Sequence, residues 1–339
     1  MGADEGTLGM LLLFLGMGSI LAMPLTGMLA ARYGCRLIIA IASLVVAACL
    51  PFLATASTIP AFAATLLVFG AAVGTVDVAV NIQAVVVERA SGRSMMSGFH
   101  GFYSVGGIVG AGMVTALFGA GLSALMSILV ISGIILALLL ALGRHLLPYG
   151  GEGEAARFAF PRGRVLLIGI LCFILFLAEG SVLDWSGVFL TSVRRVEPSW
   201  AGLGYVAFAA MMTLGRLTGD RIVGALGVRR ILQSGGLLAA AGFGLSVLIP
   251  SPIAGVIGFG MVGAGASNVV PVLFTAAGRQ TAMPTNLAIS AITTLGYTGI
   301  LTGPAAIGFV ARQLNLSLAL GIVAVLLVGV ALSAKRATE

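Results

Sequence analysis

Two acidic residues lie inside stretches of sequence that are otherwise almost wholly apolar. Asp77 falls within residues 61–87 and Glu179 within residues 164–193. An ionisable side chain at bilayer depth costs about 2.5–3.5 kcal/mol on insertion scales, so each needs a partner or a water-filled cavity. A carboxylate in such a place can carry a proton or hold a polar solute. The alternative for Asp77 is an inter-helix hydrogen bond, and for Glu179 a structural ion pair.

Two other polar residues follow Asp77 at spacings that fit one side of a helix. Asn81 follows it by four residues and Glu88 by eleven, so the three would share one face of a helix. We interpret Asp77 and Asn81 as part of a transport pathway. For Glu88, a solvated helix end beside Arg89 is the favoured interpretation.

A histidine adds a group that can change its charge near neutral pH. His100 opens the apolar stretch 97–119, and Ser104 follows on the same side. His100 could therefore exchange protons with Asp77 or Glu88. A hydrogen-bonded packing residue is the alternative.

The second half of the chain offers neutral groups where the first half offers charge. Asn268 occupies roughly the place that Asp77 has in the first half, and Tyr297 and Thr298 lie in the stretch 285–310. The candidate proton-coupling and substrate-binding residues are therefore Asp77, Asn81, His100, Ser104, Glu179, Asn268, Tyr297 and Thr298.

The composition identifies the surroundings of these residues. Hydrophobic residues make up 59% of the 339-residue chain and charged residues 9%, far from the composition of soluble globular proteins. A transmembrane helix needs about 20 mostly apolar residues. Eleven stretches meet this need: 7–30, 37–56, 61–87, 97–119, 121–143, 164–193, 199–217, 228–249, 252–277, 285–310 and 315–333. We predict an all-α, polytopic protein of the lipid bilayer.

The basic residues predict its orientation. Of 18 arginines and lysines, only Arg194, Arg195 and Arg312 fall on one side; the other 15, Arg216 among them, fall on alternate connections. Such an asymmetry places the richer side, with the C-terminus, in the cytoplasm. The net charge of +7 then reflects membrane insertion. No dense basic stripe with interleaved aromatics indicates nucleic-acid binding.

Several classes of function lack their motifs. Cys35, Cys49 and Cys172 have no metal-ligand spacing and are expected to be apolar fillers. No glycine run is followed by Gly-Lys-Ser or Gly-Lys-Thr, which disfavours an ATP-driven pump. The motifs of intramembrane enzymes are also absent from the sequence. We therefore expect no catalytic residues, no metal and no cofactor.

The second half of the chain repeats the first. Leu25-Thr26-Gly27 recurs as Leu217-Thr218-Gly219, and Phe69-Gly70 as Phe259-Gly260, at nearly the same offset. The stretch 164–193 has no counterpart, because its partner would precede Met1. The expected organisation is a five-span bundle (1–146) without its first helix, a cytoplasmic linker (147–163) and a six-helix bundle (164–339).

A short motif connects this organisation to a known family. Residues 27–36 read GMLAARYGCR. They resemble the loop signature of the major facilitator superfamily, Gly-x-Leu-x-Asp-Arg-x-Gly-Arg-Arg, except that Ala31 replaces the aspartate and Cys35 a basic residue. A second copy, GRLTGDR at 215–221 followed by GVRR at 227–230, keeps the acid. The resemblance implies the two-bundle fold of that superfamily, with 11 of its 12 transmembrane helices.

The motif residues are expected to form a cytoplasmic gate. Asp220 could pair with Arg216, Arg221, Arg229 or Arg230 and latch that face in one state; topology and packing alone are the alternative. The gating candidates are Gly27, Arg32, Gly34, Arg36, Gly219, Asp220, Arg221 and Arg229.

Together these observations predict a secondary transporter that works by alternating access, with protons as the driving ion. The polar segments are similar to those of a bacterial subgroup that includes a protein assigned to rhizopine transport. This likeness implies the bacterial inner membrane and a small polar solute, sugar-like or inositol-like. The alternatives are a drug or metabolite exporter of the same fold and a truncated, non-transporting sensor or scaffold.

Overall fold

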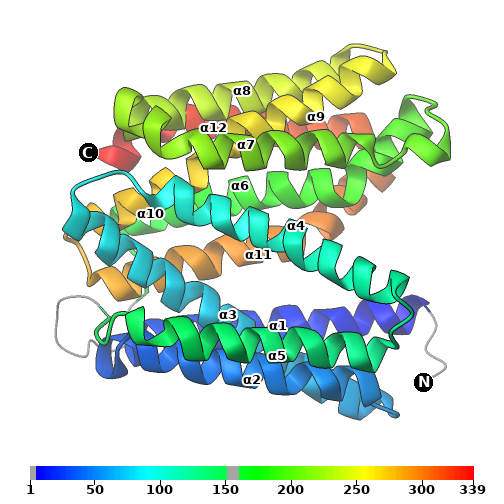
Figure 1. Cartoon of the computed structure of the whole chain (residues 1–339). Coiled ribbons are helices and arrows are strands. Elements are labelled where there is room, and N and C mark those ends of the chain that lie inside the picture. Colours follow the sequence, from blue (N-terminus) through cyan, green and yellow to red (C-terminus); the bar gives the residue numbers. More distant parts are fainter. Residues whose placement is uncertain (1–4, 151–159) are drawn as a thin grey trace. The chain divides into compact units, whose positions relative to one another are not determined.

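The computed structural model describes residues 5–150 and 160–339, with side chains from residue 11 onward. In this part of the chain all regular structure is helical (Figure 1). The long helices are α1 (Glu5–Tyr33), α2 (Cys35–Thr55), α3 (Ile59–Ser91), α4 (Met96–Gly119), α5 (Ala124–Leu142), α6 (Gly163–Val188), α7 (Leu203–Leu226), α8 (Val228–Leu248), α9 (Pro252–Ala266), α10 (Val269–Arg279), α11 (Thr285–Gln313) and α12 (Leu316–Thr338). Short helical turns occupy Gly143–His145, Phe189–Val193 and Pro198–Trp200.

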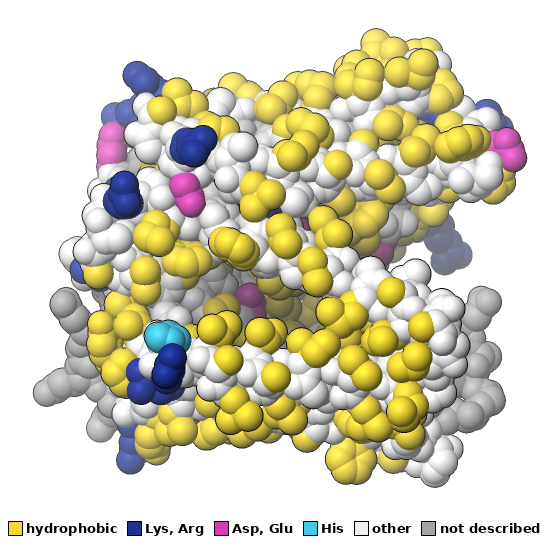
Figure 2. Space-filling view, in the orientation of Figure 1, with side chains coloured by type: hydrophobic (Ala, Val, Ile, Leu, Met, Phe, Trp, Pro, Cys, Tyr) yellow, Lys and Arg dark blue, Asp and Glu magenta, His cyan; other side chains and the backbone are white. Residues whose placement is uncertain are grey.

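These helices confirm the predicted fold class. Ten spans among the described residues are long and apolar enough to cross a membrane, with α9 and α10 counted as one, Pro252–Arg279. The expected eleventh span corresponds to α7, whose second half carries Arg216, Asp220 and Arg221. Hydrophobic side chains cover most of the face in Figure 2, as expected where lipid is the solvent. Most of the expected linker, residues 151–159, lies outside the described residues.

The chain forms two compact units, neither of which is continuous in sequence. Unit 1 comprises Met1–Val87, Gly106–Phe160 and Thr281–Thr294; unit 2 comprises Glu88–Val105, Pro161–Gln280 and Leu295–Glu339. The helices α3, α4 and α11 therefore contribute one segment to each unit. The bundle boundaries expected from the sequence stay a prediction.

In unit 1, α1 packs closely against its neighbours. A Cβ at Gly70 of α3 would collide with the Leu15 carbonyl of α1. The unit 1 segment of α11 is held to α1 by two side chains: Asn286 Nδ2 donates to Gly27 O at 2.7 Å, and Ser290 Oγ donates to Met23 O at 2.6 Å. The glycine at position 27 thus serves a close helix crossing.

The turn between α1 and α2 holds the segment that follows α5. Arg36 donates from Nε to Leu146 O at 2.8 Å and from Nη2 to Arg144 O at 2.9 Å. Gly34 lies in the left-handed region at φ 82°, and a Cβ there would meet the Pro148 carbonyl. In the first motif copy, therefore, Gly34 and Arg36 fasten the start of the central connection.

Unit 2 is built on close crossings of α8 with α9 and α12 and of α7 with α9. The α8–α9 crossing has glycine on both sides: a Cβ at Gly242 or at Gly258 would meet the other helix's backbone. Phe259 of α9 lies edge-on to both Phe189 and Phe243, and all three are fully buried. Arg194 Nη2 donates to the last carbonyls of α8, Ser246 O and Val247 O.

Also in unit 2, the start of α4 is held by a buried carboxylate. Glu88 Oε2 accepts from the backbone N–H groups of Met95 and Met96 at 2.8 and 2.9 Å, and Glu88 Oε1 accepts from Thr275 Oγ1 at 2.6 Å. Glu88 is only 5% exposed, so its interpretation as a solvated helix end was wrong. The first N–H groups of a helix lack intrahelical partners, and a carboxylate satisfies them.

We expect Gly34→Ala to lower the thermal stability of the detergent-solubilised protein. A left-handed residue with a Cβ costs about 1–2 kcal/mol, before its contact with the Pro148 carbonyl is counted. Gly133→Ala, in open space on α5, is the matched control and should leave the melting temperature unchanged or raise it. Equal melting temperatures for the two variants would show that the turn does not require glycine at position 34.

We expect Glu88→Ala to lower the free energy of unfolding by about 2 kcal/mol or more, because it removes three hydrogen bonds to a buried carboxyl group. Thr275→Val, which removes one of the three, should have a smaller effect. Glu197→Ala, at an exposed carboxylate, should have none. Denaturant unfolding measures all three, and a neutral Glu88→Ala would refute the capping role.

Candidate functional site

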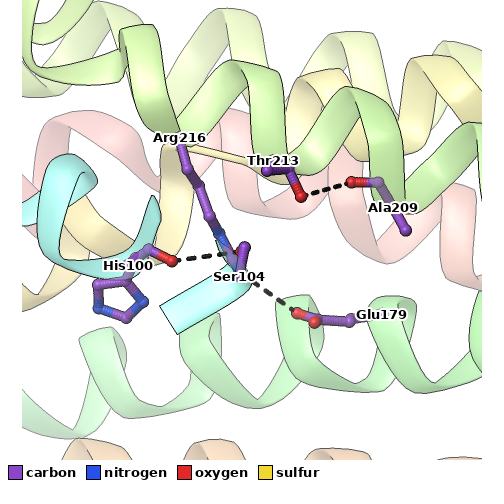
Figure 3. Close-up of polar contacts among 6 residues, drawn as sticks. All are labelled: His100, Ser104, Glu179, Ala209, Thr213 and Arg216. Carbon is purple, nitrogen blue, oxygen red and sulfur yellow. Dashed lines mark hydrogen bonds and ion pairs between the residues drawn. The ribbon is translucent and has the colours of Figure 1, made fainter. Parts of the chain in front are cut away.

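Three of the residues predicted from sequence meet a fourth in unit 2. Arg216 Nη1 donates to Ser104 Oγ at 2.9 Å, and Arg216 Nη2 lies 3.8 Å from Glu179 Oε2. Ser104 Oγ in turn donates to His100 O at 3.3 Å. Figure 3 shows the guanidinium reaching from α7 to the α4 segment of unit 2 and to α6. We call Glu179, Arg216, Ser104 and His100 the arginine site.

Arg216 was predicted wrongly from the sequence, which placed it on a cytoplasmic connection. It lies within α7, ten residues before the last residue, Leu226, and is 6% exposed. Gly227, at φ 81°, ends the helix, so α7 runs well past the end expected for this span, residue 217. The matching signal was Gly34, which ends α1 in the same conformation in the first repeat.

The guanidinium of Arg216 is incompletely satisfied. It has five N–H donors, and Nη1 makes its hydrogen bond to Ser104. Its Nε is buried and has no hydrogen-bond partner among the described residues. At 3.8 Å the contact with Glu179 is an ion pair without a hydrogen bond. A buried charge in this condition is costly unless its counter-charge stays in place.

The two charged groups differ in accessibility. The side chain of Arg216 is 8% exposed, whereas that of Glu179 is 26% exposed. The carboxylate is therefore the more exposed member of the pair.

His100 combines the two interpretations given to it. Its ring packs against Phe274 with 5.6 Å between centroids, as a packing residue would. Its Nε2 is nevertheless buried and without a hydrogen-bond partner in the described part of the chain. Ser104 contacts the backbone carbonyl of His100, and in Figure 3 the ring points away from Ser104.

The gating residue Asp220 has a different partner from those expected. Its Oδ2 accepts from the Gly98 N–H at 3.0 Å, so it joins Glu88 in capping α4. Arg216 pairs with Glu179 instead, and Arg229 lies 3.9 Å from the exposed Glu339. The gating role expected for Asp220 stays a prediction, and in this structure its carboxylate binds a helix N-terminus.

Asn268 has a structural place at the break between α9 and α10. Its Nδ2 donates to Gly215 O at 3.0 Å and to Ser267 Oγ at 3.1 Å. A Cβ at Gly219 would collide with its amide oxygen, so the motif glycine lets this side chain approach α7. The interruption of this span lies at Ser267 and Asn268, just before Pro271.

The other candidates make contacts of their own. Asp77 and Asn81 belong to unit 1, where Asn81 Nδ2 donates to Asp77 O at 2.9 Å and to Asp77 Oδ1 at 3.3 Å. In α11, Tyr297 lies against Phe176 with 6.2 Å between centroids, and Thr298 Oγ1 donates to Leu295 O at 2.7 Å. Arg32 stacks on the adjacent Tyr33.

Comparisons with known proteins agree with these features. The sequence profile of the Major Facilitator Superfamily matches residues 1–283. An uncharacterized MFS-type transporter of Yersinia pestis is 56% identical over the whole chain and 88% of its own length. Membrane protein MosC of Rhizobium meliloti is 31% identical over 94% of the chain and 78% of its own length.

A solved structure shows the same fold. The fucose:proton symporter of E. coli aligns with 99% of this chain and 92% of its own, with a TM-score of 0.81 and 16% identity. The resemblance stated from the sequence is thereby confirmed, and the chain belongs to the Major Facilitator Superfamily.

Proposed function

We propose that this protein is a proton-coupled secondary transporter of a small polar solute, working by alternating access in a bacterial inner membrane with its C-terminus in the cytoplasm. Membership of a transporter family and relatives named as transporters support transport rather than enzymatic chemistry. The fold likeness to a fucose:proton symporter favours proton symport of a sugar-like or inositol-like solute as the first hypothesis. The asymmetry of basic residues supports the orientation.

The observation that carries the proposal is the ion pair of Glu179 and Arg216. Protonation of the accessible Glu179 would remove the counter-charge of a guanidinium that is almost fully buried. The buried cation then requires another partner or another environment. A proton can shift a conformational equilibrium only by its differential affinity for the two states, and such a pair supplies that difference.

Asp77 is a second candidate for coupling. Among the described residues, its carboxylate is hydrogen-bonded by Asn81, one turn later on its own helix. This is not the inter-helix bond that the sequence offered as the structural alternative. In the described residues, the hydrogen bond to this half-buried carboxylate comes from its own helix, which supports the pathway hypothesis.

We expect Glu179→Gln to reduce proton-coupled uptake at least tenfold, because an amide cannot take up the coupling proton. Proteoliposomes loaded with a pH-sensitive dye report proton entry on addition of L-fucose, D-xylose, myo-inositol, D-glucuronate or D-gluconate. Asp77→Asn is measured in the same way. Glu197→Gln, at an exposed acid, should behave as wild type. Full proton entry in both Glu179→Gln and Asp77→Asn would refute the coupling role.

A double-mutant cycle tests the pair itself. Glu179→Gln leaves a buried cation without its counter-charge and should cost about 1–3 kcal/mol of unfolding free energy, less than a fully buried pair because Glu179 is partly exposed. Arg216→Gln should cost less, since the accessible carboxylate can take a proton. The double variant should be more stable than the sum of the single losses predicts. Additive losses would show that the two side chains do not interact.

A further inference from the structure

We infer that the arginine site binds a carboxylate group of the transported solute, which takes the place of Glu179 at the guanidinium of Arg216. This inference rests on the proposed transport function and names the chemical class of its substrate. The guanidinium of Arg216 has two edges with different contacts. Nη1 is bonded to Ser104, whereas Nε and Nη2 form the other edge, the one that binds a carboxylate through two parallel hydrogen bonds.

That edge is only loosely occupied. Its Nε is buried without a hydrogen-bond partner in the described residues, and its Nη2 faces Glu179 at 3.8 Å. Hydrogen bonds between a guanidinium and a carboxylate are about 2.7–2.9 Å long. A carboxylate that approached from the accessible side of Glu179 could therefore bind Arg216 more closely than Glu179 does.

The surroundings favour a monoanion. The observed contacts of Arg216 are to one acid, Glu179, and to one neutral hydroxyl, Ser104. A neutral polyol would leave the buried cation uncompensated once Glu179 is protonated. A phosphate carries about 1.5 to 2 negative charges near neutral pH, more than one arginine can balance. A carboxylate balances it one to one.

The other elements packed against α6 do not change this balance. The segments 252–278 and 316–334, which include α9 and most of α10 and α12, contain no ionisable residue. On α11, Tyr297 packs on Phe176. Two further acids belong to unit 2 near the start of α4, but each is engaged there: Asp220 accepts from the Gly98 N–H and Glu88 from the Met95 N–H. The charges in direct contact with Arg216 are therefore that of Glu179 and, on binding, that of the ligand.

Replacement of Glu179 by the solute carboxylate at Arg216 would couple proton binding to solute binding. Before binding, Arg216 is balanced by ionised Glu179; after binding, it is balanced by the solute carboxylate while Glu179 holds a proton. One proton and one carboxylate then enter together, and no net charge moves. Uptake of the acid should be driven by a pH gradient and be insensitive to an imposed membrane potential.

Thermal unfolding of the purified protein tests the inference without knowledge of the natural solute. The probes are sodium acetate, D-glucuronate and D-gluconate, each matched with a neutral counterpart (acetamide, D-glucose, D-glucitol) at constant ionic strength. Glu179→Gln removes the competing carboxylate, so the acids should raise its melting temperature more than that of wild type. Arg216→Gln should not respond, and Arg312→Gln, at an exposed arginine, should respond as wild type.

The outcomes separate the inference from the proposed function. No stabilisation of Glu179→Gln by any of the acids, or equal stabilisation by acids and neutral counterparts, would overturn the inference. If Glu179→Gln does not fold, wild type at acidic and neutral pH replaces it, with stronger acid binding expected at acidic pH. Arg216-dependent binding without any uptake by proteoliposomes would overturn transport instead. Uptake of neutral sugars that needs Glu179 but not Arg216 would overturn the inference of a carboxylate solute and would leave the proposed transport function standing.

Discussion

A guanidinium buried in the middle of α7 is the constraint on which the rest of unit 2 depends. The charge of Arg216 cannot be neutralised by loss of a proton, so α4 and α6 must bring polar groups to it. They bring a serine hydroxyl at hydrogen-bond distance and a carboxylate at ion-pair distance. The first contact fixes the side chain, and the second leaves room for exchange. Arg216 thus has one firm partner, Ser104, which contributes to helix packing, and one replaceable partner, Glu179, on which the proposed transport depends.

Helix ends and close crossings position that site. Glu88 and Asp220 both accept hydrogen bonds from the first turn of α4, which fixes the helix that carries Ser104. Gly219 admits the Asn268 side chain beside α7. In unit 1, Arg36 and Gly34 fasten the chain that leaves α5. Asp220 and Arg36 thus act on a backbone N–H group and on backbone carbonyls, where the sequence suggested ion pairs between side chains for Asp220.

Hydropathy was sufficient to predict the helical fold, because lipid requires long apolar helices with their hydrogen bonds satisfied internally. The repeat and the loop motif at 27–36 were sufficient to predict the family. Sequence patterns were insufficient to predict the contacts of individual polar residues inside the helices. Arg216 was placed at the cytoplasmic end of its span, 199–217, because charged residues lower the hydropathy of the sequence that follows, whereas α7 continues to Leu226. Glu88 was taken as solvated because it lies near the end of its stretch, beside Arg89. The break at Asn268 depends on side-chain bonds to Gly215 and Ser267, which spacing along one segment does not reveal.

Glu179 should gain a proton when a carboxylate occupies Arg216. Infrared difference spectroscopy measures this directly, because a protonated carboxylic acid has a carbonyl stretch that an ionised carboxylate lacks. Addition of sodium acetate near neutral pH, where acetate itself stays ionised, should produce that band in wild type and not in Glu179→Gln. Arg216-dependent acetate binding without the band would show that the proton and the carboxylate are not exchanged together.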